Sequence, residues 1–272
     1  MATPSGCACL VGKQTGAQAS QCLWRRRDFA SVLHLPSEIA QPSSRGADLA
    51  ATANRILLRS NYLSEKDILN LLALCTGLKR PLFRAKLYRA LVLVLYCTGV
   101  RFGEALRLRI RDVDTRSGVL FVDTFKGRAR WVPIHRSLCR ELDRYMVARV
   151  KYAPSDPEAR LFVGVNQRVL PVETASRTFR RLFKMAGLKP ERGRVGPRPY
   201  DLRHAFAVHR LSRWYRQGVN LHARLPWLSA YMGHIDIVGT ETYLNTTPEL
   251  LDLAANRLRR RYRKAGNEDL SK

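Results

Sequence analysis

The alternation of apolar and polar positions predicts a mostly helical chain that becomes ordered near residue 64. Ser64 precedes acidic residues and then helical apolar spacing, which is typical of a capped helix start. Residues 84–97 are apolar most of the way round, which predicts a buried helix. Gly99 follows, and glycine suits the left-handed position that ends a helix. We expect the next helix to begin near Arg101.

Two short runs, residues 119–123 and 130–134, follow a strand pattern instead. Both are β-rich, and a Lys-Gly turn lies between them, so they predict an antiparallel hairpin. The sequence therefore predicts an α+β fold, mainly helical with one small antiparallel sheet. Further helices are expected at 136–151, 173–186, 200–217, 226–232, 236–244 and 248–264.

The first sixty residues differ from the rest of the chain. Their low periodicity and scattered small residues favour a loose arm, with one helix at most near residues 48–58. We expect a poorly ordered or truncated arm at 1–60, one domain at 61–264 and a flexible tail at 265–272.

Composition narrows the class of partner. The 272 residues include 48 Lys and Arg against 22 Asp and Glu, a formal net charge of +26, and 46% of them are apolar. That apolar fraction is ordinary for a folded protein and excludes a disordered polycation. Such a positive charge favours a polyanionic partner, because it raises the local concentration of phosphates.

A membrane surface is the competing polyanion. The most apolar run, residues 90–96, is far shorter than the roughly 20 residues that cross a bilayer. The N-terminus lacks the apolar region of a secretory signal, although residues 1–27 contain no acid and weakly resemble a transit peptide. The six cysteines have no paired CxxC spacing, which argues for a reducing compartment and against a zinc site.

Five short elements carry candidate chemistry, and each also has a plain structural interpretation. Arg101 lies at a helix start beside a glycine turn, where backbone amides favour an anion, yet a lone arginine there is more often a cap. Lys126 lies at the hairpin tip, where lysines are usually just solvated. Tyr200, Arg203 and His204 share one helix face, as a polar edge of a packed helix also would.

The last two elements are His234, directly after a glycine, and Tyr243, nine residues later. A lone histidine is more often structural than catalytic, and a lone tyrosine on a short helix is usually a core residue. The order of all five is more specific than any one of them, and it resembles the tyrosine recombinase, or phage-integrase, family. The resemblance covers residues 62–260.

The motifs that carry the resemblance are T-G-x-R-x-x-E-x-L-x-L at 98–108, the Lys-Gly tip followed by Val-Pro, and L-R-H-x-F-A at 202–207. The Gly-His turn and the tyrosine at the family's spacing complete the set. The stretch at 206–231 is similar to integrases carried on bacterial transposable elements. The resemblance implies the integrase catalytic-domain fold.

The resemblance also implies a DNA strand transferase that cuts and rejoins DNA through a 3′-phosphotyrosyl intermediate, in integration, recombination or transposition. Tyr243 is implied as the nucleophile, with Arg101, Arg203 and His234 as donors to the phosphate and Lys126 as the general acid. Guanidiniums bind phosphate oxygens bidentately, which a lysine does less well. No cofactor or metal is implied, because the arginines supply the positive charge.

Three further positions qualify this assignment. Where the family most often has histidine, three residues before its second arginine, this chain has Tyr200. A phenol with a pKa of about 10 donates a hydrogen bond but is a poor base at neutral pH, so the deprotonation of Tyr243 is the step affected. Glu104 and His204 match supporting positions of the family.

Basic residues on elements that face DNA in relatives are candidate DNA contacts, although each taken singly is as often solvated surface. They are Arg107, Arg109, Arg111, Arg128, Arg130, Arg177, Arg180, Arg181 and Lys184. Several phosphate contacts would make affinity fall steeply with salt. The expected partner is double-stranded DNA, bound by a homotetramer on paired sites, alone or with partner recombinases, in the bacterial cytoplasm beside the nucleoid and without a membrane.

Two alternatives stay open. Relatives usually carry a helical DNA-binding domain before the catalytic one, and residues 1–60 are too short and weakly patterned for it. This shortage, together with Tyr200, supports a catalytically inactive DNA-binding remnant of a truncated integrase. A basic RNA- or ribosome-associated protein is the second alternative, but it leaves the ordered constellation unexplained.

Overall fold

The structure is a computed structural model, and all of its described residues belong to one compact unit of the chain, residues 39–272. The expected arm at 1–60 and the expected tail at 265–272 lie outside the described residues, and so do Lys126 and Arg128. The described residues are 62–78, 81–124, 129–164, 169–192, 195–245, 250–257 and 259.

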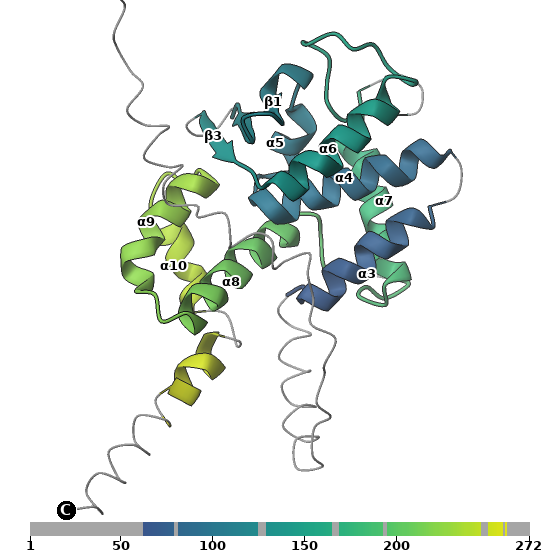
Figure 1. Ribbon diagram of the computed structural model, residues 1–272. Helices are drawn as coiled ribbons and strands as arrows, with labels where there is room; N and C mark the ends of the chain where they lie inside the picture. The colour runs from purple at the N-terminus through teal and green to yellow at the C-terminus, as the bar shows by residue number, and fades with distance from the viewer. Residues whose placement is uncertain are drawn as a thin grey trace, which may run out of the picture. The chain divides into compact units, whose positions relative to one another are not determined.

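Helix α4 (Leu82–Thr98) is the centre of the packing, with α3 (Glu65–Thr76), α6 (Arg136–Arg149) and α8 (Asp201–Arg216) against it (Figure 1). Most of its residues are buried, as its apolar sequence predicts. Helix α3 begins as expected, because Ser64 and Asp67 form a capping box in which Ser64 Oγ accepts from the Asp67 backbone amide at 3.2 Å.

The sheet has three antiparallel strands in the order β1-β2-β3, namely β1 (Val113–Asp114), β2 (Val119–Val122) and β3 (Arg130–Pro133). The predicted hairpin is confirmed, and the short strand β1 is added to it. Val122 is opposite Arg130, and Leu120 is opposite Val132. Because strand side chains alternate, Arg130 lies on the same face as the buried Val132, the face that covers the core.

Helix α7 (Val172–Met185) shows the amphipathic spacing expected of a surface helix. Ala175, Phe179 and Leu182 are fully buried, whereas the arginines at 177, 180 and 181 are exposed. Short elements connect the larger ones: α5 (Phe102–Arg107) follows α4, and the 3-10 helix η3 (Ile110–Asp112) leads into β1.

The last part of the unit contains α8, α9 (Leu221–Met232) and α10 (Val238–Asn245), and α10 contacts both others. Helix α9 begins earlier than the predicted residue 226, because the Asn220 side chain accepts from the Ala223 amide and caps a longer helix. Pro226 lies inside it. Residues 250–257 and 259 are helical, within the expected range.

The end of α4 touches α8 closely at Gly99. Its φ is +61°, as the predicted left-handed helix end requires, and a Cβ there would lie 2.4 Å from the Phe206 ring. Only glycine permits both features, so this residue brings the loop before α5 against the first turns of α8. None of the described helices is long and apolar enough to span a bilayer.

Candidate active site

Arg101 lies between Gly99 and helix α5. Its backbone amide donates to Glu104 Oε2 at 2.9 Å, and its Nη1 donates to Glu104 Oε1 at 2.9 Å. Its Nη2 donates to the carbonyl oxygen of Gly233 at 3.1 Å, and 36% of its side chain stays exposed. The guanidinium is therefore fixed in direction while part of it remains open to a ligand.

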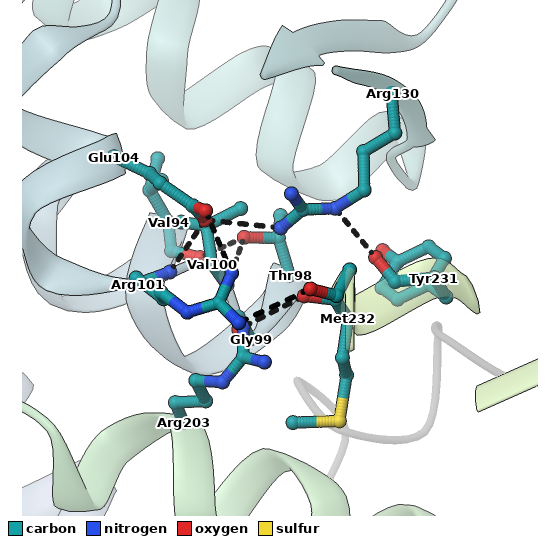
Figure 2. A network of polar contacts seen from close by, with 11 residues as sticks. Val94, Thr98, Gly99, Val100, Arg101, Glu104, Arg130, Arg203, Tyr231 and Met232 are labelled. Carbon is teal, nitrogen blue, oxygen red and sulfur yellow. Dashed lines mark hydrogen bonds and ion pairs between the residues drawn. The ribbon is translucent and has the colours of Figure 1, made fainter. Parts of the chain in front are cut away.

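Glu104 is a buried carboxylate, 2% exposed, that two guanidiniums share. Besides Arg101, it accepts from Arg130 Nη2 at 3.0 Å (Figure 2). Burial alone raises a carboxyl pKa, but the hydrogen bonds and charges of Arg130 and Arg101 outweigh it and hold the pKa of Glu104 below its usual value. The carboxylate is thus ionised at neutral pH and anchors both arginines.

Arg203, in the first turn of α8, is 1% exposed and forms no salt bridge with any carboxylate of the described residues. Its Nη1 donates to the carbonyl oxygens of Gly99 at 2.5 Å and Met232 at 2.9 Å. Its Nη2 is buried and meets no hydrogen-bond partner in the described part of the chain. Burial and the charge of Arg101 lower the pKa of Arg203 to about 10, so it stays cationic at neutral pH. A buried cation with an unused donor is suited to bind an anion.

His234 directly follows Gly233, which ends α9 with a φ of +71°. Its Nδ1 lies 2.7 Å from the hydroxyl of the buried Thr240. Burial and the charges of three arginines, Arg203 first, lower the pKa of His234 to about 4. The ring is therefore neutral at pH 7, and when Thr240 donates to Nδ1, Nε2 carries the proton and can donate.

Tyr243, on α10, lies between two histidine rings and is 4% exposed. Its ring centroid is 4.9 Å from that of His204, edge to face, and 6.3 Å from that of His234. Burial and, to a smaller extent, Tyr200 raise the pKa of Tyr243 to about 12, although the charge of Arg203 opposes both. The phenol is protonated at neutral pH, so a reaction at its oxygen requires help in losing the proton.

Tyr200 and His204 also lie beside the Tyr243 phenol. Tyr200 is 50% exposed, directly before α8, and its hydrogen bond with Tyr243 works against ionisation. Burial lowers the pKa of His204 although the nearby Asp201 opposes the shift, so His204 is neutral at pH 7. The structure thus brings together the expected residues from four segments: Arg101, Glu104, Tyr200, Arg203, His204, His234 and Tyr243.

The remaining candidates lie in three settings. Lys126 and Arg128 are outside the described residues. Arg107 is exposed, whereas Arg109 and Arg111 both pair with Glu158. One face of α7 carries three exposed arginines, Arg177, Arg180 and Arg181. Lys184, on the same helix, pairs with Glu191.

Arg130, which we expected among the DNA contacts, lies inside the candidate site. Its side chain is 9% exposed and donates from Nε to the carbonyl oxygen of Tyr231 at 3.0 Å, in addition to Glu104 (Figure 2). The alternation of the strand contains the signal for this position, because Arg130 shares a face with Val132. In the part of the chain that the structure describes, no cluster of His, Cys, Asp or Glu could hold a metal ion.

Residues 61–249 match the phage integrase family. The chain belongs to that family. The predicted resemblance and the predicted catalytic-domain fold are therefore confirmed.

Individual relatives of this integrase-family chain agree. The Sinorhizobium fredii protein named as integrase/recombinase y4rB is 36% identical over 210 residues, which are 75% of this chain and 67% of the relative. Tyrosine recombinase XerA of Pyrococcus furiosus is 31% identical over 173 residues, 62% of this chain and 54% of the relative. A crystal structure of XerA recombinase has a TM-score of 0.57 at 26% identity, covering 73% of this chain and 65% of that one. The chain thus spans about half to two thirds of the length of these proteins.

Proposed function

We propose that this protein is a site-specific DNA recombinase that cuts and rejoins DNA through a 3′-phosphotyrosyl link at Tyr243. One observation carries the proposal. The buried phenol of Tyr243 lies against a neutral His234 and close to Arg203, whose Nη2 is buried and lacks a partner among the described residues. The nucleophile, Tyr243, therefore lies next to the anion-binding group, Arg203, as phosphoryl transfer to a tyrosine requires.

Charge development explains why two arginines suit this reaction. A phosphodiester carries one negative charge, and the pentacoordinate state reached during attack carries more on its non-bridging oxygens. Arg203 Nη2 and the open part of Arg101 would donate to those oxygens, with His234 Nε2 as a third donor. Cations fixed in a buried site stabilise the more charged state most, because no solvent has to reorganise around it.

The bond changes balance without an added reagent. The Tyr243 oxygen would attack phosphorus while the bond to the 5′ oxygen breaks, so that the 3′ phosphate remains on the tyrosine. The departing 5′ oxygen takes a proton, and the resemblance implies that Lys126 donates it. Attack by a second 5′ hydroxyl then restores the phosphodiester and releases Tyr243, and the energy of the original bond is retained throughout.

Loss of the proton from Tyr243 is the demanding step. With a pKa of about 12, roughly one phenol in 100,000 is ionised at pH 7. Arg203 already limits this cost, because its charge favours the phenolate and opposes the effect of burial on the pKa of Tyr243. We assign Tyr200 the role of a hydrogen-bond partner that orients the phenol of Tyr243, and the released proton passes to solvent water beside this half-exposed side chain.

The proposed partner is double-stranded DNA. The net charge of +26 and the exposed arginines on α7 support it, because a duplex carries closely spaced phosphates. Exchange between two duplexes requires a cut in each of four strands, so we propose a homotetramer on paired sites, alone or with partner recombinases.

A suicide substrate tests the proposal directly. The substrate is duplex DNA from the ends of the element that flanks the gene, with a nick beside the cleavage position. Cleavage then frees a short strand that carries the new 5′ hydroxyl. Because this strand diffuses away, the DNA cannot be rejoined and the protein stays on the 3′ phosphate. We expect a protein–DNA adduct that survives denaturation with the wild-type chain and none with Tyr243→Phe. If the wild-type chain binds these duplexes but forms no adduct, it is a catalytically inactive DNA-binding remnant.

One observation favours this second candidate. The hydrogen bond of Tyr200 to Tyr243 opposes ionisation of the Tyr243 phenol, which the cleavage reaction requires.

A further inference from the structure

The carboxyl end of α9 accepts hydrogen bonds from three arginines that come from three different elements. The bonds are Arg130 Nε to Tyr231 O at 3.0 Å, Arg203 Nη1 to Met232 O at 2.9 Å, and Arg101 Nη2 to Gly233 O at 3.1 Å. Figure 2 shows the three guanidiniums converging on this helix end. We call Arg101, Arg130 and Arg203 the arginine cluster.

Helix physics explains why one helix end can hold three cations. The last carbonyl oxygens of a helix have no partner within the helix, and the aligned peptide dipoles give that end a partial negative charge. Three successive carbonyls of α9 therefore place the guanidiniums side by side despite their mutual repulsion. His234 comes directly afterwards, so the same helix end also sets the position of the third proposed phosphate donor.

Arg130 is the member of the cluster that the proposed reaction does not use. From strand β3 it joins two other parts of the site, because its Nη2 binds the Glu104 carboxylate at 3.0 Å while its Nε binds the end of α9. Glu104 in turn holds Arg101 through a backbone amide and a side-chain bond. With 9% of its side chain exposed, Arg130 is poorly placed for the outer surface of a duplex.

The fit around Arg130 is close. A Cβ on Gly233 would lie 2.5 Å from Arg130 Nη1, so the guanidinium lies against a glycine where any side chain would displace it. Nη1 itself is buried and without a hydrogen-bond partner among the described residues. Gly233 therefore has two roles: it adopts the positive φ that ends α9, and it leaves space for the Arg130 guanidinium.

We propose that Arg130 is a positioning residue for strand transfer: it joins Glu104 to the end of α9 and thereby fixes Arg101 and His234 against the scissile phosphate. The proposal rests on the proposed function. Without Arg130, the buried Glu104 would keep only Arg101 as its close cation, and Arg101 would be drawn toward the carboxylate. The end of α9 would also lose one of its three anchors.

Single-turnover cleavage of the nicked duplex at saturating protein measures this role apart from DNA affinity. We expect Arg130→Gln to lower the cleavage rate constant by about 10- to 100-fold, because misplacement by about 1 Å has costs of that order. Affinity for DNA, measured in the Tyr243→Phe background, should change by less than about threefold. Arg130→Lys should restore little of the rate, since lysine keeps the charge but not the planar fork that reaches two acceptors.

Two comparisons separate positioning from loss of structure. Arg144→Gln removes an arginine that is 72% exposed on α6 and should leave rate, affinity and melting temperature unchanged. If Arg130 acts through Glu104, the double variant with Glu104→Gln should cleave no more slowly than Glu104→Gln alone. An Arg130→Gln protein that cleaves at the wild-type rate would overturn the proposal, and so would one whose entire loss lies in DNA affinity.

A DNA-free readout keeps this inference distinct from the proposed function. If the wild-type chain forms no adduct, the proposed function fails, yet the arrangement around Arg130 can still be tested by NMR. The Arg101 side-chain Nε–H signal and the His234 amide signal should shift in Arg130→Lys, which keeps the charge, and stay in place in Arg144→Gln. Unchanged signals in Arg130→Lys would overturn the positioning role.

Discussion

Gly233 is the single residue on which the geometry of the arginine cluster depends most closely. Its φ of +71° suits glycine, and the missing Cβ leaves the space that Arg130 occupies. Gly187 has the same φ of +71°, but a Cβ at that position would meet no atom within 4 Å. A comparison of substitutions at the two glycines therefore distinguishes the cost of backbone strain from the cost of steric crowding.

Replacement of each glycine by alanine should give different results. We expect Gly187→Ala to lower the free energy of unfolding by about 1 kcal/mol, from the left-handed backbone alone. Gly233→Ala should cost about 2–4 kcal/mol, because Arg130 must also move, and should slow cleavage. Chemical denaturation of both variants measures the difference, and equal losses would show that Arg130 does not fill this space.

The sequence predicts the helix-capping residues well, but it predicts poorly which charged side chains are buried. Ser64 and Gly99 act locally, through bonds to residues within one turn, so their pattern predicts their role. Arg130 depends on α9, about one hundred residues later, and no local pattern contains that contact. Only strand alternation hints at its direction, whereas the convergence of the arginine cluster needs the tertiary fold.

Another buried arginine, outside the arginine cluster, holds the end of helix α6 to the segment that follows it. Arg149, at the end of α6, is 2% exposed and was not expected from the sequence, because helix periodicity does not distinguish it from a solvated arginine. It donates from Nε to Leu161 O at 3.0 Å and from its other two nitrogens to the carbonyl oxygens of Pro154 at 2.6 Å and Arg160 at 2.8 Å. It thereby fixes the segment that follows α6.

Arg149→Met should lower the free energy of unfolding by about 2–4 kcal/mol, because buried carbonyl oxygens lose charged donors. DNA cleavage well below the melting temperature should be unaffected, since Arg149 touches none of the proposed site. Arg144→Met, an exposed arginine on the same helix, is the matched control and should change stability by less than about 0.5 kcal/mol. Comparable melting temperatures for the two variants would contradict this role of Arg149.

At the scale of the whole molecule, the positive charge divides between two settings. A few guanidiniums are buried in the candidate site, whereas others lie on exposed helix faces such as that of α7. Composition predicts the polyanionic partner but not this division, because burial of Arg130 and Arg203 depends on packing between distant segments.

The exposed face of α7 gives a prediction about salt. Substitution of Arg177, Arg180 and Arg181 by glutamine should reduce the slope of log affinity against log salt by about 2–3, since each phosphate contact contributes about 0.9. The same substitution on α6, at Arg136, Arg140 and Arg144, removes equal charge from another exposed face. Binding of a duplex from about 50 to 200 mM salt measures both, and equal slopes for the two triple variants would exclude α7 as the DNA-binding face.

Mass spectrometry of the trapped adduct shows directly whether Tyr243 becomes linked to DNA. After digestion of protein and DNA, the peptide containing Tyr243 should carry the mass of a 3′-linked nucleotide, with the modification on the tyrosine oxygen. A nucleotide on any other residue, or an unmodified Tyr243 peptide from a confirmed adduct, would contradict this link.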